Sequence, residues 1–165
     1  MNPTLGRISL PKLEGFRCFA CGNVNPIGLH MTFYLQGDHV CSEITLSEDH
    51  AGWDSVAHGG ILTTLLDEVM SWAVVVFKRT FFVTRTIELK FLRPVPVNTP
   101  LVIKGTIESM PDQTSCKATG LIVDHRGATL TRAWADIVYL PEKRLSLISP
   151  PLREAMLELF QKIAV

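Results

Sequence analysis

Residues 58–77 carry the strongest hydrophobic pattern in the chain. Apolar side chains recur there at helical spacing and cover most of the helix circumference, as Ile61, Leu62, Leu65, Leu66, Val69, Met70, Trp72 and Ala73. The polar residues form one stripe, which consists of Thr63, Thr64, Asp67, Glu68 and Ser71. A helix with so wide an apolar surface packs against neighbours on most sides. The pattern therefore predicts a central helix over residues 58–77.

The segments on both sides of this helix have the pattern of β-strands. Two runs precede it and four follow it, at residues 28–35, 39–46, 81–93, 101–109, 115–124 and 128–140. In the first run after the helix, Ile87, Leu89 and Phe91 alternate with polar residues, as in a half-buried strand. The links between the runs are short, which predicts mainly antiparallel pairing.

The two ends of the chain differ. Residues 150–165 predict an amphipathic C-terminal helix, with Ser149 as a candidate N-cap and Pro151 in the first turn. Its apolar face consists of Leu152, Ala155, Met156, Leu159, Phe160 and Ile163. Residues 1–26 have no such periodicity and predict an irregular lead-in.

The order of elements excludes a doubly wound parallel sheet, in which helices alternate with strands. We expect an α+β fold, in which one antiparallel sheet of about five to six strands wraps around the central helix. The length of 165 residues suits a single domain, residues 1–165. A half-wrapped sheet leaves open edges, which proteins cover by pairing, so we expect a homodimer joined through the sheet.

Composition narrows the possible partners and the location. The net charge is zero and the chain has no long basic run, so we expect neither a nucleic acid nor a membrane as partner. The N-terminus lacks the pattern of a secretory signal, and the longest apolar stretch, near residues 69–77, is interrupted and too short to span a bilayer. We therefore expect a cytoplasmic protein.

Cys18 and Cys21 form a C-x-x-C pair, and the other two cysteines lie far away in sequence. A structural zinc site needs a second ligand pair, and no other C-x-x-C or H-x3-5-H follows. The residues after the pair, among them Asn23 and Pro26, favour a turn over the helix of a thioredoxin-like motif. We favour a structural turn and expect no metal ion or cofactor; a partial metal or redox site is the alternative.

The candidate chemistry lies at the start of the central helix and on its polar stripe. The first N–H groups of a helix have no partner inside it, and glycines allow a ligand to approach the backbone closely. Gly59 and Gly60, which follow His58, are therefore a candidate oxyanion hole for a thioester carbonyl. Asp67, desolvated on a buried helix, is a candidate general base or nucleophile.

These two groups are too far apart to act together within one chain. Nine helical residues put His58 and Asp67 roughly 13 Å apart, whereas a donor and a base must both lie about 3 Å from the reacting group. Two antiparallel helices from two subunits satisfy both distances. We therefore expect a site shared across a two-fold interface, with the Gly59 amide from one chain and Asp67 from the other.

Structural roles stay open for these residues. His58 is alternatively a capping or packing residue, and Asp67 is alternatively held in a salt bridge with Arg85 or Arg132. Glu68 lies beside Asp67 and is either the carboxylate that matters or a solvated or paired companion.

The run His-Gly-Gly-Ile-Leu-Thr-Thr-Leu-Leu-Asp-Glu, residues 58–68, resembles the central-helix signature of the PaaI-like hotdog-fold acyl-CoA thioesterase family. Residues 84–95 resemble the next strand of that family, and residues 18–29 resemble the lead-in of one subgroup. The resemblance covers about residues 16–140. It implies a hotdog homodimer, often paired into a homotetramer, that hydrolyses an acyl-CoA thioester to a free acid and CoA.

The resemblance also implies a role for each site residue. Asp67 is the carboxylate that activates water or attacks the thioester, Gly59 supplies the oxyanion amide, and His58 positions that turn. Thr84 falls where related enzymes carry a Ser or Thr that helps to hold the water; an ordinary strand threonine is the alternative.

One position departs from the pattern of the family. Some relatives carry an Asn six residues before the histidine, where this chain has Gly52, so either Trp53, Asp54 or backbone alone completes the pocket. Candidate substrate-binding residues are Gly60, Glu68, Trp53 and Arg93. Further candidates are Lys90, Lys78 and Arg79 for the CoA phosphates, and Met70, Trp72 and Phe82, together with Trp53, for the acyl channel.

Two other functions on the same scaffold stay open. One is a non-catalytic acyl-CoA-binding protein, and the less favoured one is a hydratase or dehydratase, which needs a catalytic histidine with an acidic partner. The sequence has no G-x-S-x-G elbow, P-loop or H-E-x-x-H motif, so other hydrolase and nucleotide-binding classes have no support.

Overall fold

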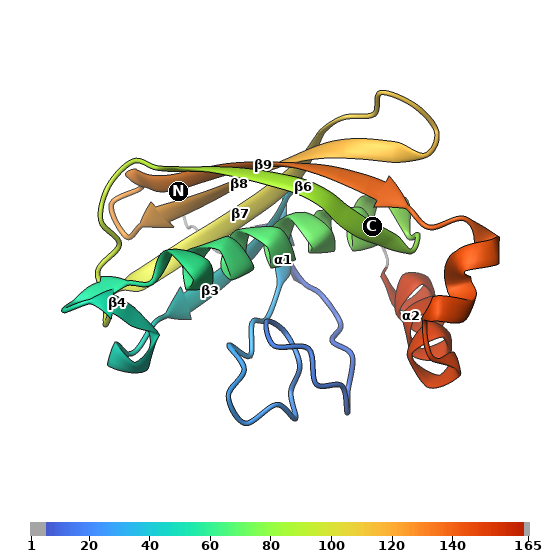
Figure 1. Cartoon of the computed structure of the whole chain (residues 1–165), viewed down its shortest axis with the longest axis horizontal. Coiled ribbons are helices and arrows are strands. Elements are labelled where there is room, and N and C mark those ends of the chain that lie inside the picture. The colour runs from blue at the N-terminus through green and yellow to red at the C-terminus, as the bar shows by residue number, and fades with distance from the viewer. Residues whose placement is uncertain (1–5, 164–165) are drawn as a thin grey trace.

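One seven-stranded antiparallel sheet curves over one long helix, α1 (Gly59–Lys78), in the computed structural model, which describes residues 6–163 (Figure 1). The strand order is β1-β2-β3-β7-β8-β9-β6. The bounds are β1 (Arg7–Ser9), β2 (Tyr34–Gln36), β3 (His39–Thr45), β6 (Phe82–Phe91), β7 (Pro100–Ser109), β8 (Ser115–Asp124) and β9 (Thr129–Tyr139). The remaining elements are η1 (Glu48–His50), the ribbon of β4 (Ala51–Trp53) and β5 (Val56–Ala57), η2 (Glu142–Leu147) and α2 (Pro150–Lys162).

Two glycines let α1 lie close to the middle of the sheet. A Cβ atom on Gly105 in β7 would lie 2.7 Å from the carbonyl oxygen of Val69, and one on Gly120 in β8 would lie 3.0 Å from Leu66 Cδ2. The two glycines are direct partners in the β7–β8 pairing. Leu66, Val69 and Met70 are fully buried here, and burial of such a side chain contributes roughly 1.5–3 kcal/mol.

The side of α1 away from the sheet is covered in its middle by residues 10–33, which we call the strap (Figure 1). Within the strap, the Met31 N–H donates to the Ala20 carbonyl at 2.9 Å, so its two arms run together. Phe33 stacks on Trp72 of α1, with 4.5 Å between the ring centroids. The helix is therefore enclosed by the sheet on one side and by an irregular segment on the other.

The helix α2 packs beside the C-terminal end of α1 (Figure 1). The rings of Phe81 and Phe160 meet edge to face at 5.6 Å. Arg79 ends α1 in the left-handed conformation, and its Nη2 donates to the Ile163 carbonyl at 2.9 Å. These contacts fix the far end of the central helix.

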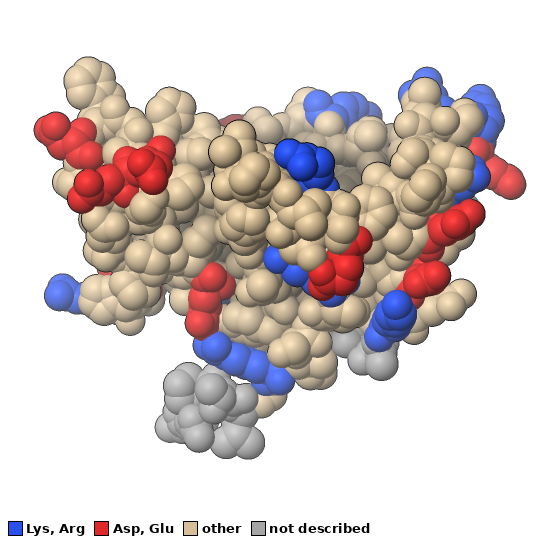
Figure 2. Space-filling model, turned by 90° about the horizontal axis from the view of Figure 1, so that it is seen from below, with Lys and Arg blue, Asp and Glu red and all other residues tan. Residues whose placement is uncertain are grey.

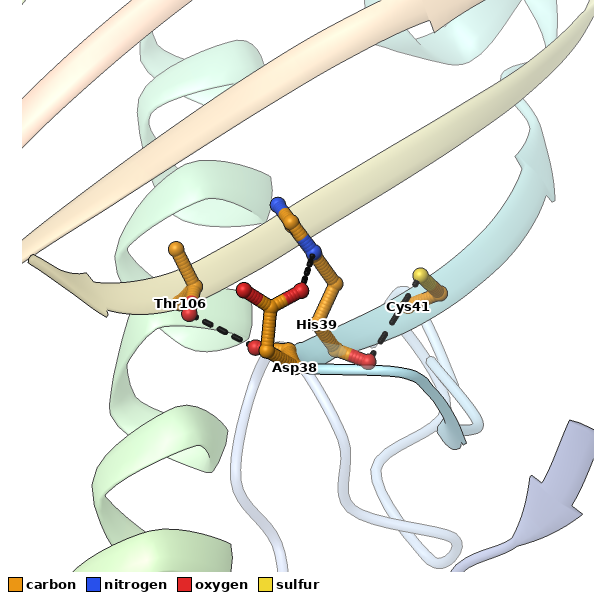
Figure 3. A network of polar contacts seen from close by, with 4 residues as sticks. All are labelled: Asp38, His39, Cys41 and Thr106. Atoms are coloured by element: carbon orange, nitrogen blue, oxygen red, sulfur yellow. Dashed lines mark hydrogen bonds and ion pairs between the residues drawn. The ribbon is translucent and has the colours of Figure 1, made fainter.

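The turn between β2 and β3 is fastened to strand β7 (Figure 3). Thr106 of β7 donates its hydroxyl to the Asp38 carbonyl at 2.6 Å. The Asp38 carboxylate in turn lies 2.6 Å from His39 Nδ1, and the Cys41 thiol lies 3.9 Å from the His39 carbonyl. Because β3 pairs directly with β7, these contacts hold the turn beside the strand against which β3 is registered.

The predicted class, the antiparallel sheet around one helix and the C-terminal helix are confirmed. The sheet has seven strands rather than five to six, because Arg7–Ser9, within the predicted irregular lead-in, pairs with β2. The strand predicted at residues 28–35 begins only at Tyr34, since the residues before it belong to the strap. Part of the prediction for the two ends, at residues 1–5 and 164–165, lies outside the described residues.

By length and composition alone, α1 is long and apolar enough to cross a membrane, which corrects the expectation that no stretch is long enough. Ten of its residues are buried inside the protein: Leu62, Leu65, Leu66, Val69, Met70, Trp72, Ala73, Val74, Val75 and Val76. The core helix of a soluble protein passes the same test. Burial against the sheet therefore accounts for the composition of α1.

The close approach at Gly105 predicts a large effect of any side chain there. We expect Gly105→Val to lower the free energy of unfolding by about 1–3 kcal/mol, since the new Cβ meets helix backbone that cannot move aside. Urea unfolding followed by circular dichroism measures the change. Lys104→Ala on the same strand is the control and should stay within about 0.5 kcal/mol; equal stability of both variants would contradict this packing.

Candidate active site

Asp67 of α1 and Thr84 of β6 are joined by a hydrogen bond. The Thr84 hydroxyl donates to Asp67 Oδ1 at 2.8 Å, and both side chains are partly buried. Within the described residues, the other carboxylate oxygen, Oδ2, accepts no hydrogen bond from this chain. Asp67 is thus oriented by one neutral donor and keeps one oxygen for an outside group.

A β-bulge in β6 aims Thr84 at the helix. Thr84 pairs with Ile137 of β9 and shares its buried inner face, whereas Thr86 pairs with Asp136 on the outer face. The pairing slips by one residue between the two threonines, so Arg85 is the extra residue. Without the bulge, residues two apart would point to the same face. The bulge therefore separates an inner Thr84–Asp67 pair from an outer Thr86–Asp136 pair.

The salt bridges considered for Asp67 are not formed. Arg85 Nη2 lies 3.8 Å from Asp136 Oδ2 on the outer face, and the Arg132 guanidinium lies 5.9 Å from the ring centre of Trp134. None of the ion pairs between described residues includes Asp67. No cation among residues 6–163 therefore neutralises its carboxylate.

His58 caps the start of α1 with its side chain. Nδ1 accepts a hydrogen bond from the Gly60 N–H at 2.9 Å, so the proton of the neutral ring is on Nε2. Within the described residues, the Gly59 N–H donates to no group of this chain. The structure thus brings His58, Gly59 and Gly60 into one turn and leaves the Gly59 amide free, whereas that of Gly60 is already used.

A cavity of about 440 Å³ opens beside Gly59, on the side that the ribbon β4–β5 and the end of β6 form. It is lined by Trp53, Val56, Ala57, Gly59, Leu62, Phe91, Leu92, Arg93, Pro94 and Val95. Trp53 is 85% exposed and Phe91 is 57% exposed, which is far more than such aromatic side chains have in a core. The cavity is therefore an open, mainly apolar half-site next to a free amide.

The structure does not bring Asp67 to this cavity. Asp67 lies eight residues after Gly59 on the same helix, roughly 12 Å along its axis. The acyl-channel candidates also separate, because Met70 and Trp72 are buried in the core and only Trp53 lines the cavity. Within one chain the amide and the carboxylate are two separate half-sites.

The basic candidates are likewise spread over the molecule. Arg93 lines the cavity beside Gly59. Lys90 lies on the outer face, 5.4 Å from the ring centre of Trp134, and Lys78 and Arg79 end α1 at its far end.

Acidic side chains gather at the end of the face that carries β4, on the left of Figure 2, where η1 begins with Glu48 and Asp49.

Glu68 points toward the strap instead of joining Asp67. Its Oε1 accepts from Trp72 Nε1 at 3.1 Å, and its Oε2 lies 3.9 Å from Cys18 Sγ. Burial is the main cause that raises the Glu68 pKa to about 7, and the nearby Cys18 adds to it. Sequence reasoning missed this contact, because fifty residues separate Cys18 from Glu68 and no local spacing indicates it.

Comparison with known proteins relates this geometry to a family. Residues 54–116 match the sequence model of the thioesterase superfamily, which is less than half of the chain. The fold of the chain is the hotdog fold of solved thioesterase superfamily proteins. The matched segment begins just before α1 and ends in β8, so it includes the free Gly59 amide, Asp67 and Thr84.

Solved structures show the same hotdog architecture at low sequence identity. A thioesterase superfamily protein matches with a TM-score of 0.64 and 23% identity over 69% of this chain and 56% of its own. PaaI of E. coli, from the phenylacetic acid degradation operon, matches with a TM-score of 0.63 and 16% identity over 68% of this chain and 81% of its own. A hypothetical thioesterase of Streptococcus pneumoniae, solved with coenzyme A, matches with a TM-score of 0.57 and 24% identity over 62% of this chain and 79% of its own.

A curated relative is similar over part of its length. Verlamelin biosynthesis protein B of Lecanicillium sp. is 32% identical over 106 residues, which cover 48% of this chain and 41% of that protein. The chain thus spans less than half of this relative and 56% of the first structural one. These likenesses show the hotdog fold of the chain.

Proposed function

We propose that this hotdog protein is an acyl-CoA thioesterase that hydrolyses a thioester to a free acid and CoA. The observation that carries the proposal is the Asp67 carboxylate, which is partly buried, is oriented by Thr84 and has no cationic partner in the part of the chain that the structure describes. Such a group is suited to take a proton from water or to attack a carbonyl carbon. The CoA-bound thioesterase of S. pneumoniae with the same fold supports the substrate class.

The site is completed by a second copy of the chain. Strand β6 is ten residues long and forms one edge of the sheet, where its outer side has no partner strand among the described residues. Long, unprotected edges pair with other chains, and Val83 on this strand is 49% exposed. Pairing of two β6 strands across a two-fold axis runs the two α1 helices antiparallel. The Asp67 of one subunit then faces the Gly59 turn of the other.

In this arrangement the reaction needs only groups of the protein and water. The thioester carbonyl accepts a hydrogen bond from the Gly59 amide, and the helix N-terminus stabilises the oxyanion. Asp67 takes a proton from the water that attacks the carbonyl carbon, or attacks that carbon itself and is released by water in a second step. The carbon–sulfur bond breaks, and the leaving sulfur takes the proton that Asp67 accepted from water, or a solvent proton where Asp67 is the nucleophile, so that CoA departs as the thiol. Thr84 holds Asp67 in position throughout.

The cavity beside Gly59 supplies one wall of the substrate site. Trp53, Phe91 and Leu92 offer apolar surface for the acyl group or the pantetheine arm, and Arg93 is the cationic residue at its rim for a CoA phosphate. The CoA phosphates are therefore expected beside Arg93. We further propose that the protein acts in the cytoplasm.

A hydratase or dehydratase has less support. Such an enzyme needs a histidine that exchanges protons with the acyl chain, whereas the Nδ1 of His58 is occupied by the Gly60 amide. Among the described residues no carboxylate contacts this ring. A non-catalytic acyl-CoA-binding protein is the remaining alternative, and the next experiment separates it from an enzyme.

Removal of the Asp67 charge tests the proposed chemistry. We expect Asp67→Asn to lower kcat for an acyl-CoA by about 10²–10⁴-fold with unchanged folding, since the amide can neither take a proton nor attack. Released thiol is measured with acyl-CoAs from acetyl to palmitoyl and with aryl-CoAs. Asp136→Asn, in the matched outer pair with Thr86, is the control and should keep full activity. Full turnover by the Asp67 variant rules out the assigned role, and absence of turnover in the wild type supports the binding protein.

The hydroxyl of Thr84 is expected to contribute through the orientation of Asp67. A hydrogen bond to a charged group is worth about 1.5–3 kcal/mol, so Thr84→Ala should lower kcat by about 10–100-fold. Thr84→Ser keeps the donor and should recover most of the rate. Thr86→Ala, on the outer face of the same strand, should have no effect. Similar kcat values for Ala at both positions would show that Thr84 is an ordinary strand residue.

Sharing of the site between subunits can be tested by mixing two inactive variants. Asp67→Asn removes the base, and Gly59→Val places a side chain over the amide, where its Cβ would lie 3.3 Å from Phe91 Cζ. In a mixed dimer one of the two sites has both groups intact. Co-expression of the two variants should therefore restore about one quarter of the wild-type activity. No recovery, in a preparation shown to contain mixed dimers, contradicts the shared site.

A further inference from the structure

Three ligand atoms meet where the strap crosses α1. The Sγ atoms of Cys18 and Cys21 and a carboxylate oxygen of Glu68 all lie within 4.8 Å of one another. Cys18 and Cys21 come from the strap, and Glu68 comes from the middle of the central helix. The proposed thioester chemistry uses none of these three groups. Sulfur and oxygen ligands at this spacing are close enough together to coordinate a single metal ion.

The backbone holds the two sulfur atoms on one side of a tight turn. The Gly22 N–H donates to the Cys18 carbonyl at 2.9 Å, which closes the turn directly after the C-x-x-C pair. A Cβ on residue 22 would lie 2.5 Å from both the Cys18 nitrogen and the Phe16 carbonyl oxygen, so only glycine fits. The His30 ring nitrogen Nδ1 lies 2.9 Å from the Gly22 carbonyl and supports the turn from behind. The geometry of the pair is therefore fixed before any ligand binds.

No cation is paired with these three groups. Among the described residues, no Lys or Arg forms an ion pair with Cys18, Cys21 or Glu68. The gathered sulfur and oxygen atoms are therefore open to a metal cation.

We propose that Cys18, Cys21 and Glu68 bind a zinc ion. Two thiolates select zinc over magnesium or calcium, which prefer oxygen ligands only. Zinc is usually four-coordinate, so three protein ligands leave one position for water or an outside donor. Each thiol that bonds to the metal as a thiolate releases its proton to solvent. The ion joins the strap to α1 one residue after Asp67 and so fixes the face of the helix that carries the candidate catalytic carboxylate.

The experiment measures metal content and thiolate coordination directly, independent of turnover. The full-length protein, purified without chelator, should contain about one zinc per chain by mass spectrometry of the metals. After removal of zinc, added Co²⁺ should give a thiolate-to-cobalt charge-transfer absorption. Added Zn²⁺ should abolish this absorption and raise the Tm in a concentration-dependent way.

Variants assign the ligands. Zinc binding should be weakened in each of the variants Cys18→Ser, Cys21→Ser and Glu68→Gln. Removal of a group that only hydrogen-bonds to a metal ligand lowers metal affinity by about 10–100-fold, and loss of a ligand itself should lower it further. Asp67→Asn is the matched control, because it removes the neighbouring carboxylate and should bind zinc normally while turnover is lost. Cys41→Ala removes a distant thiol and should also bind normally. If a serine variant fails to fold, Glu68→Cys keeps the test open, since a third thiolate should strengthen the cobalt absorption.

Three results would overturn the zinc site. One is a protein without stoichiometric zinc and without cobalt absorption. Another is zinc that stays bound in the three ligand variants. The third is a Cys18–Cys21 disulfide in the freshly isolated protein with no metal bound, which would assign the pair to redox chemistry. None of these results depends on whether Asp67 hydrolyses a thioester, so the two proposals fail separately.

Discussion

The close contact between α1 and the centre of the sheet determines the rest of the structure. Gly105 and Gly120, paired in adjacent strands, have no side chains, and the helix backbone therefore lies directly on the sheet. This contact buries the row that includes Leu66, Val69 and Met70. With that row fixed inward, the polar stripe of the helix must turn sideways, toward β6 and the strap. The rotation of α1 thus sets what Asp67 and Glu68 can reach.

The adjacent carboxylates of Asp67 and Glu68 consequently lie in different surroundings. Asp67 faces the edge strand and is held by a hydroxyl from β6, whereas Glu68 faces the strap, an indole N–H and two sulfur atoms. About 100° of helix rotation separates consecutive residues, so the same helix presents a candidate catalytic group on one side and a candidate metal ligand on the other. Hydrolysis and metal binding, as proposed, share an element without sharing atoms.

Much of the fold and of the candidate site follows from local pattern. Helical spacing predicted α1 within one residue at each end, and alternation predicted β7, β8 and β9 closely. The strand β1 was missed, because three residues carry too little periodicity and gain their pairing from β2, which lies far along the chain. The contact of Glu68 with Cys18 was missed for the same reason: it depends on where an irregular segment folds back. The bulge at Arg85 likewise comes from pairing with β9, since the sequence alone gives an unbroken strand.

The bulge at Arg85 has a consequence for how β6 can change. Before the bulge the even-numbered residues of β6 face inward, and after it the odd-numbered ones do. Thr84 and Ile87, three positions apart, therefore share the inner face. Loss of a single residue at this point would restore regular alternation. The side chains on one side of the deletion would then exchange the inner and outer faces of the sheet. Sequence variation along this strand is therefore constrained in its count of residues as well as in their chemistry. A related chain with a gap or an insertion here has lost the orientation of its threonine even where the threonine itself is kept.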